Sequence, residues 1–266
     1  AFGQDGPRGH MTAYDHAIQS TSGMMRTTGT PEVNPIKVGS PVIDYACGTM
    51  NAFALSAALF QRGLLKDEYG VDFFKVEWIE GDINTPKQHG NPTILPTVRP
   101  VSIASNTSGK SLSRLLADGE IQGLIGIGEP DSFGSHPDVV RLYPDYREAE
   151  KDYYKRTKIF PIMHLVVIRK DTYEKHPFVA TSLYKAFVQA KAWAQQKLNY
   201  GGTLRYTLPW MLAELDEIKQ VFGGDPWPYG LEPNRPTLEA LVRYMVDQGL
   251  IDKPVKIDDL FVQTHG

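Results

Sequence analysis

The sequence predicts an α/β protein, because short strand-like runs alternate with longer helical patterns. Residues 36–43 ("IKVGSPVI") form a β-branched run, residues 49–68 have the apolar periodicity of a helix, and residues 73–81 ("FFKVEWIEG") have the pattern of a strand. Two further apolar runs, residues 123–128 ("GLIGIG") and 159–171 ("IFPIMHLVVIRKD"), are predicted as buried strands. A strand, a helix and a second strand in this order are typical of a βαβ unit.

The other segments predict helices and loops. Residues 1–35 are rich in glycine and proline, which favours a loosely folded segment with one helix over residues 12–25. Ser111 is a helix start signal, and Gly119 is a stop signal. Charged, tyrosine-rich residues 143–158 predict a solvated helix. The C-terminal part is mainly helical, with helices expected over residues 176–198, 208–222 and 237–249.

These elements suggest three regions along the chain. Residues 1–35 form the loosely folded N-terminal segment, residues 36–158 an α/β lobe, and residues 159–266 the mainly helical remainder of another lobe. We also expect the strand over residues 36–43 to pair with the segment around Trp78.

Composition excludes several classes of partner. The formal net charge is −3 and the sequence pI is about 6.2, which disfavours binding to nucleic acid or to an anionic membrane surface. No apolar run approaches the roughly 20 residues that cross a bilayer, and residues 1–16 are too polar for a signal peptide. Cys47 is the single cysteine, so no intrachain disulfide forms and a cytoplasmic location is expected. A homo-oligomer is compatible with these properties.

Residues 1–62 carry the motifs "FGQDGP", "YDHAIQSTSGMM" and "TGTPEVNPIKVGSPVIDYACG". In this order they resemble the class III CoA-transferases of the formyl-CoA transferase type. The resemblance implies that Asp44 attacks an acyl-CoA to give an aspartyl anhydride, with CoA as the cofactor. The alternative is an Asp44 that only caps a helix. The glycine-rich loop and the oxyanion donors that this chemistry needs do not follow Arg62.

Residues 63–266 carry "RGLLKDEYGVD", "SLSRLLADGEIQGLIG" and "DPWPYGLEPNRPTLEALVRYMVDQGL". In order and spacing they resemble 4,5-dihydroxyphthalate decarboxylase and its relatives. That family has the two-lobed fold of type 2 periplasmic binding proteins, so the resemblance implies this fold with an incomplete first lobe. The two resemblances meet at residues 60–63 ("FQRG"), inside the predicted helix, and the chain is therefore interpreted as a chimera.

The longer resemblance implies decarboxylation of an aromatic dicarboxylate of the 4,5-dihydroxyphthalate type. Two alternatives stay open: a non-catalytic binding protein for a small carboxylate, and a remnant of a CoA-transferase that uses Asp44. Each would bind a small molecule, which in the first two cases is a carboxylate.

Decarboxylation of such a ring needs a general acid that protonates the carbon bearing the departing carboxylate. His164 is the candidate, because it lies in the apolar run of residues 159–171, although a structural histidine is the alternative. Glu129 follows the predicted strand of residues 123–128, where α/β sheets place ligand groups. Glu129 is expected to hold a ring hydroxyl or a divalent cation, or else to be a carboxylate bound by backbone amides. No metal-binding motif is present.

Donors for the substrate carboxylates are the remaining requirement. Ser108, Lys110 and Ser111 precede a predicted helix, whose N-terminal amides favour anions, although capping alone explains Ser111. Arg141 and Arg169 are alternative carboxylate clamps, or surface ion pairs.

Two aromatic residues complete the predicted site. Trp227 and Tyr229 lie in the sequence "PWPYG", and they either wall an aromatic pocket or pack this loop onto the domain.

Overall fold

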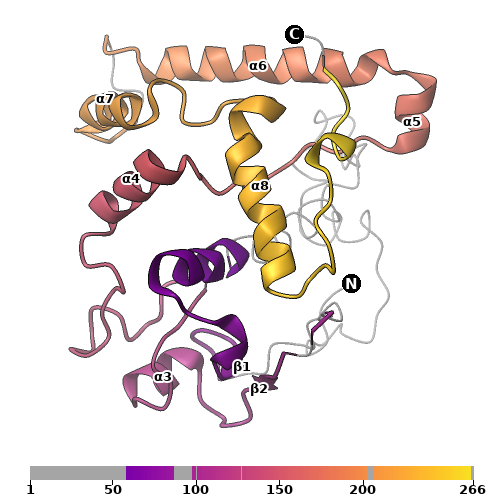
Figure 1. Cartoon of the computed structure of the whole chain (residues 1–266). Coiled ribbons are helices and arrows are strands. Elements are labelled where there is room, and N and C mark those ends of the chain that lie inside the picture. Colours follow the sequence, from indigo (N-terminus) through magenta and orange to yellow (C-terminus); the bar gives the residue numbers. More distant parts are fainter. Residues whose placement is uncertain (1–57, 87–97, 100, 127, 203–205, 265–266) are drawn as a thin grey trace, which may run out of the picture. The chain divides into compact units, whose positions relative to one another are not determined.

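The computed structural model divides the chain into two compact units, which are described separately (Figure 1). The first contains residues up to 95 and residues 101–139, and the second contains residues 96–100 and 140–266. The structure describes residues 58–86, 98–99, 101–126, 128–202 and 206–264. The predicted N-terminal segment, the strand over residues 36–43, its pairing with the segment around Trp78, and Asp44 lie outside these residues.

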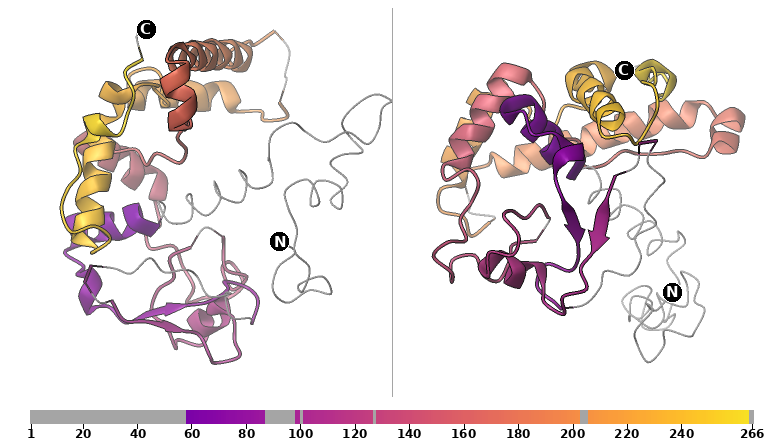
Figure 2. Two further views of the ribbon diagram at one scale, coloured as in Figure 1. Left: turned by 90° about the vertical axis from the view of Figure 1, so that its right-hand side faces the viewer. Right: turned by 60° about the horizontal axis from the view of Figure 1, so that its bottom comes forward.

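A short parallel sheet organises the first unit. Strand β1 (Trp78–Glu80) pairs with β2 (Ile103–Ser105) in the register Trp78↔Ile103 to Glu80↔Ser105. The right-hand view of Figure 2 shows the two strands side by side. Around the sheet lie a helix over residues 58–69, the 3₁₀ helix η2 (Phe73–Lys75) and helix α3 (Leu112–Ala117).

The helix over residues 58–69 ends at Gly70, whose φ of 67° is one that glycine adopts readily. The side chain of Asp72 then accepts a hydrogen bond from the N–H of Phe74 and begins η2. The indole N–H of Trp78 donates to the carbonyl of Phe73 at 2.9 Å, and the two rings lie 5.2 Å apart. Local caps and one aromatic contact therefore lead the chain from this helix into β1.

Helix α3 joins the sheet through its first turn. Ser111 caps it, since its Oγ accepts from the N–H of Arg114 at 3.2 Å. Leu112 and Leu115 are buried, and the N–H of Leu112 donates to the carbonyl of Asp82, just after β1. The predicted helix start at Ser111 and stop near Gly119 are confirmed.

Helices make up the regular structure of the second unit among its described residues. They are α4 (Tyr146–Thr157), α5 (Lys170–Lys175), α6 (Phe178–Leu198), α7 (Met211–Phe222), α8 (Leu231–Asp247) and the 3₁₀ helix η3 (Ile257–Asp259). The core includes Leu238 and Val242 of α8 and Ile257 of η3, and Tyr244 of α8 is fully buried. No described helix is both long and apolar enough to span a bilayer.

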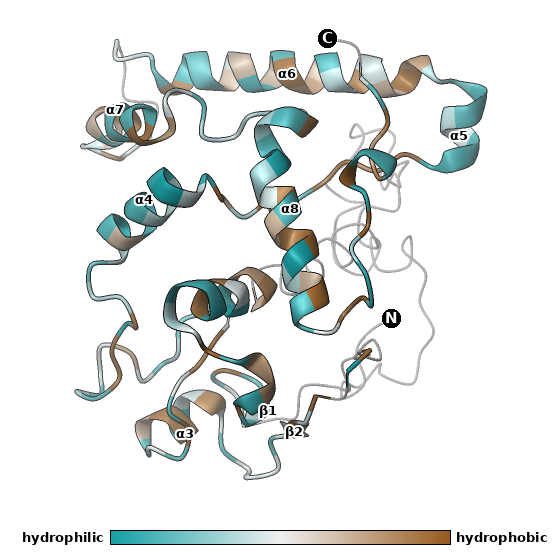
Figure 3. Cartoon of the chain, viewed as in Figure 1, coloured by the Kyte–Doolittle hydropathy of each residue, from teal (hydrophilic) through white to brown (hydrophobic). Residues whose placement is uncertain are grey.

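Helix α4 is held by ion pairs and by an aromatic contact, since the ring of Tyr154 lies 4.3 Å from that of Phe222. It has no buried residue and is largely hydrophilic in Figure 3. Arg147 contacts Glu214 (2.8 Å) and Glu217 of α7, and Lys151 contacts Glu217 as well. The prediction of a solvated helix over residues 143–158 is confirmed.

The described elements agree with an α/β fold, but two strand predictions are wrong, and the strand predicted over residues 73–81 is confirmed only for Trp78–Glu80, since Phe73–Lys75 is η2. Residues 159–169 have no regular secondary structure, and α5 follows at Lys170. Leu165, Val166 and Val167 are 58%, 65% and 87% exposed, so no described strand covers this run, and a strand needs a hydrogen-bonded neighbour.

The second incorrect strand is the glycine-rich run. Residues 123–126 and 128 are not in a strand, because glycine weakens strands and offers no side chain to pack.

Helix α8 also begins earlier than predicted, at Leu231, with Pro233 in its first turn, where a missing N–H costs nothing.

Candidate functional site

Polar side chains gather where the two parallel strands end. After β1, the side chain of Asp82 accepts hydrogen bonds from the N–H groups of Asn84 (3.0 Å) and Thr85 (2.9 Å). After β2, the side chain of Asn106 accepts from Ser108 Oγ at 2.6 Å and donates to the carbonyl of Lys110 at 2.7 Å. The carboxyl ends of parallel strands are where open α/β sheets bind ligands.

A third segment, residues 129–132, joins these two turns. The side-chain amide of Asn84 donates to the carbonyl of Glu129 (3.0 Å) and accepts from the N–H of Asp131 (2.8 Å). The N–H of Ser132 donates to Ser113 Oγ at 3.0 Å, and the two hydroxyls lie 2.9 Å apart. We call residues 82–85, 106–113 and 129–132 together the strand-end cluster. It includes four predicted site residues, Ser108, Lys110, Ser111 and Glu129, the last through its backbone carbonyl.

The predicted anion donors in this cluster have partners within the protein. Lys110 Nζ contacts Asp118 (2.9 Å) and Glu120 (2.5 Å). The hydrogen bonds that Lys110 donates to Asp118 and then to Glu120 raise the pKa of Lys110, and the bond from Lys110 lowers the pKa of Asp118. The first two amides of α3, those of Leu112 and Ser113, donate to backbone carbonyls of residues 82 and 83. A substrate carboxylate would therefore have to compete with these contacts.

Other candidates lie in the second unit. His164 is exposed within residues 159–169. Arg169 forms a bidentate ion pair with Asp171, with hydrogen bonds of 3.0 and 2.7 Å. Arg141 lies over the ring of Tyr146, 5.2 Å from its centroid. Arg169 thus has the surface ion pair that was one of its two predicted roles.

Trp227 and Tyr229 are fixed by contacts with the helices. The ring of Trp227 packs edge-on against Phe160 at 4.9 Å. Lys191 of α6 contacts the carboxylate of Asp225, donates to the carbonyl of Trp227 at 2.7 Å, and lies 4.0 Å from the centroid of Tyr229. These contacts fit the alternative in which the loop packs onto the domain.

The carboxylate of Asp225 is partly buried in this arrangement. Burial acts to raise its pKa, but hydrogen bonds from Lys191, the N–H of Trp227 and the side chain of Gln195 outweigh this and lower it. The carboxylate is therefore ionised throughout the neutral range.

Sequence reasoning did not identify Asn84, Asn106 or Ser113, although they form most of the bonds within the strand-end cluster. A usable signal was present, because Asp and Asn directly after a strand favour turns closed by their own side chains. The partners across the cluster are up to 47 residues away in sequence, and no local pattern specifies them.

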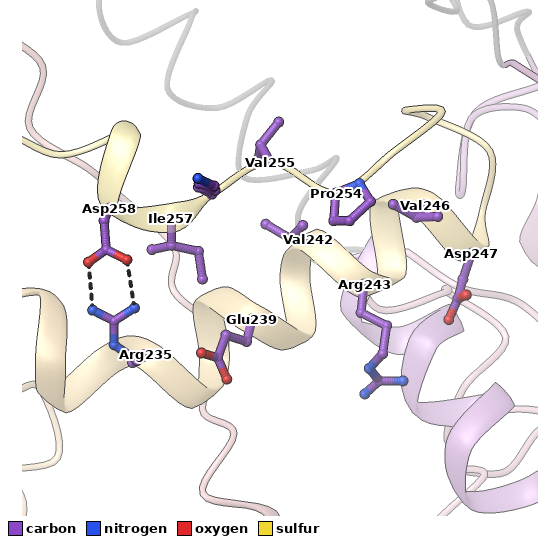
Figure 4. Close-up of a pocket in the computed structure, with 11 residues that line it drawn as sticks. Arg235, Glu239, Val242, Arg243, Val246, Asp247, Pro254, Val255, Ile257 and Asp258 are labelled. Atoms are coloured by element: carbon purple, nitrogen blue, oxygen red, sulfur yellow. Dashed lines mark hydrogen bonds and ion pairs between the residues drawn. The ribbon is translucent and has the colours of Figure 1, made fainter.

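A groove of about 470 Å³ runs along α8 and contains none of the predicted site residues (Figure 4). Val242, Val246 and Val255 form part of its apolar lining, and Arg235 pairs with Asp258 at one end. Among the residues that the structure describes, no group of three or more His, Cys, Asp or Glu side chains could hold a metal ion.

Comparison with known proteins gives two results for different parts of the chain. Residues 1–68 match the model of CoA-transferase family III. The chain is also 33% identical over 211 residues to the 4,5-dihydroxyphthalate decarboxylase of Comamonas testosteroni, which covers 79% of this chain and 63% of that protein. The chain resembles both families. Both resemblances predicted from the sequence are thus confirmed.

Further relatives repeat this division. The 4,5-dihydroxyphthalate decarboxylase of Pseudomonas putida is 28% identical over 104 residues, which is 39% of this chain and 40% of that protein. The acetyl-CoA:oxalate CoA-transferase of Acetobacter aceti is 40% identical over 62 residues, or 23% of this chain and 16% of that protein. The chain thus spans less than two thirds of the decarboxylases and a small part of the transferase.

Proposed function

We propose that this chain is a decarboxylase that acts on an aromatic dicarboxylate of the 4,5-dihydroxyphthalate type. The observation that carries the proposal is the similarity to the Comamonas decarboxylase over 79% of the chain. The strand-end cluster supports it, since it gathers hydroxyl, amide and carboxylate groups where α/β proteins bind small ligands. The two-lobed fold of type 2 periplasmic binding proteins is part of the same proposal.

The chemistry follows from the substrate. A ring hydroxyl para to the departing carboxylate donates electron density to the carbon that carries this group. When that carbon takes a proton and the para hydroxyl gives up its own, a dienone forms. The C–C bond to the carboxylate then breaks, CO₂ leaves, and the bonding electrons restore the aromatic ring as a phenolate, which takes its proton back. The reaction therefore needs a proton donor at the ring carbon and an acceptor for the hydroxyl proton.

His164 and Glu129 have these two roles in our proposal. His164 gives a proton to the ring carbon and regains one from solvent. Glu129 accepts a hydrogen bond from the ring hydroxyl, which increases the electron density of the ring; coordination of a divalent cation is its alternative role. Ser108, Lys110 and Ser111 bind the carboxylate that remains, and Lys110 changes partner from Glu120 to do so.

Release of CO₂ from 4,5-dihydroxyphthalate tests the proposal. We expect His164→Ala to lose roughly 100-fold or more in kcat, as is typical when a general acid is removed. His176→Ala is the matched control, because His176 is also exposed and lies just after α5. Equal loss in both variants, or full activity in His164→Ala, would contradict the role of His164.

Two other outcomes would favour the alternative functions. Saturable binding of 4,5-dihydroxyphthalate without CO₂ release would indicate a carboxylate-binding protein. Acylation of Asp44 by an acyl-CoA, detected by its sensitivity to hydroxylamine, would indicate a transferase.

A further inference from the structure

We infer that Asn84 is a positioning residue that holds Glu129 in place for the reaction. This inference rests on the proposed function, in which Glu129 accepts a hydrogen bond from the ring hydroxyl. Asn84 lies 45 positions from Glu129 in sequence, and its side chain contacts the backbone carbonyl of Glu129.

The side chain of Asn84 forms hydrogen bonds with backbone groups on both sides of Pro130. Its Nδ2 donates to the carbonyl of Glu129 (3.0 Å), and its Oδ1 accepts from the N–H of Asp131 (2.8 Å). Because Pro130 has no N–H, the N–H of Asp131 is the first backbone donor after Glu129. A single side-chain amide thus satisfies an acceptor and a donor of neighbouring peptide groups, and fixes both peptide planes.

Asn84 is itself well anchored. Its own N–H donates to the carboxylate of Asp82, which also accepts from Thr85. The carbonyls of Asp82 and Ile83 accept hydrogen bonds from the first turn of α3, at 3.0 and 2.8 Å. The position of Glu129 is therefore tied through Asn84 to the end of β1 and to α3.

A glutamate in a loop needs such support to act in catalysis. Its carboxylate is exposed, so burial does not fix it. A misplacement of about 1 Å in a catalytic arrangement can cost roughly 100-fold in rate, and active groups need to be held within about 0.5 Å by surrounding contacts. Removing the amide of Asn84 should therefore reduce turnover without removing any group that touches the substrate.

The test compares Asn84→Ala with Asp72→Ala. Asp72 lies in the same unit, and its carboxylate accepts a hydrogen bond from a backbone N–H at η2, so Asp72→Ala removes one such bond where Asn84→Ala removes two. For Asn84→Ala we expect kcat to fall by about tenfold or more and KM to change by less than about threefold, whereas Asp72→Ala keeps both values. An equal fall in both variants would show a general structural effect and would overturn the inference.

A double variant tests whether Asn84 acts through Glu129. Asn84→Ala combined with Glu129→Gln should be no slower than Glu129→Gln alone, since the group to be positioned is already gone. If the two effects multiply, Asn84 acts by another route and the inference is wrong.

Hydrogen exchange separates this inference from the proposed function. In the wild-type protein we expect the amide of Asp131 to be protected, and in Asn84→Ala to lose this protection, while Asn84→Asp keeps an acceptor and much of the protection. Unchanged protection in Asn84→Ala would overturn the anchoring. An inactive wild-type protein would contradict the proposed function, and the exchange measurement would still decide the anchoring.

Discussion

Lys191 is expected to be the main attachment of the loop over residues 225–230 to α6. Its side chain is only 18% exposed and contacts a carboxylate, a carbonyl and an aromatic ring of that loop. Lys191→Met removes the charge and both hydrogen bonds, shortens the unbranched side chain by one atom, and keeps a similar helix propensity. The change therefore isolates the polar contacts.

The cost follows from these contacts. A hydrogen bond to a charged group contributes about 1.5–3 kcal/mol, and a cation over a tyrosine ring contributes about 0.5–2 kcal/mol. Methionine restores part of this, since its sulfur packs against Tyr229 with a gain of about 0.3–1.5 kcal/mol. We therefore expect the free energy of unfolding to fall by about 2 kcal/mol near pH 7.

The pH dependence gives a second expectation. The pKa of Asp225 is lowered in the folded protein, below the unfolded value of about 3.9. The contribution of the Asp225 carboxylate to the free energy of unfolding is therefore complete above the unfolded pKa, and it is lost as the pH falls through the folded pKa. The difference in the free energy of unfolding between wild type and Lys191→Met should accordingly become smaller as the pH falls below about 4.

Urea unfolding followed by tryptophan fluorescence measures both effects, because Trp227 lies in the loop itself. Lys185→Met is the matched control: Lys185 is an exposed lysine of the same helix, and its replacement should change the free energy of unfolding by less than about 0.5 kcal/mol. A double-mutant cycle with Asp225→Asn should give a coupling energy of at least about 1 kcal/mol. Zero coupling, or equal effects of the two lysine changes, would refute this reasoning.

Three further variants test other contacts. Gly81→Ala should destabilise the first unit by about 1–3 kcal/mol in chemical unfolding, since the added Cβ would lie 3.1 Å from that of Asn106. Leu115→Ala, at a residue only 3% exposed, should cost about 2–5 kcal/mol in the same measurement. Glu217 has a pKa lowered first by its hydrogen bond from Lys151, so its stabilising contribution is present at neutral pH and is lost in acid. Glu217→Gln should therefore flatten the fall in stability between neutral and acid pH, and an unchanged slope would contradict this role.

Sequence reasoning succeeded where local interactions decide the structure. Ser111 caps α3 through the N–H three residues later, and a glycine follows that helix, so both of its ends could be predicted. The charges of α4 lie within one helix, and its solvated character was equally visible. Such features depend on residues a few positions apart.

Sequence reasoning failed where residues far apart in the sequence decide the structure. The apolar run of residues 159–171 resembles a strand, but a strand exists only beside another strand, which the sequence does not specify. Within the candidate site, Glu129 was predicted because it follows an apolar run, although that run is not a strand in the structure. The residues that hold its segment, Asn84 and Ser113, needed the folded arrangement to be identified.

The junction between the two family resemblances lies in a packed helix. Residues 58–68 fall within the CoA-transferase match, and of these Leu59 and Phe60 are 3% and 5% exposed. The guanidinium of Arg62 lies 4.7 Å from the centroid of Phe73, beyond the matched range, and burial lowers the pKa of this arginine.

A helix that buries its side chains on one partner cannot be exchanged for an arbitrary one. The transferase-like sequence supplies two buried apolar residues, Leu59 and Phe60, and a cation, Arg62, that lies over the rings of Phe73 and Trp78. The match to the transferase family and the match to the Comamonas decarboxylase together exceed the length of the chain, so they overlap. The interpretation of a chimera accounts for this overlap if the helix over residues 58–69 carries apolar residues that suit both parents.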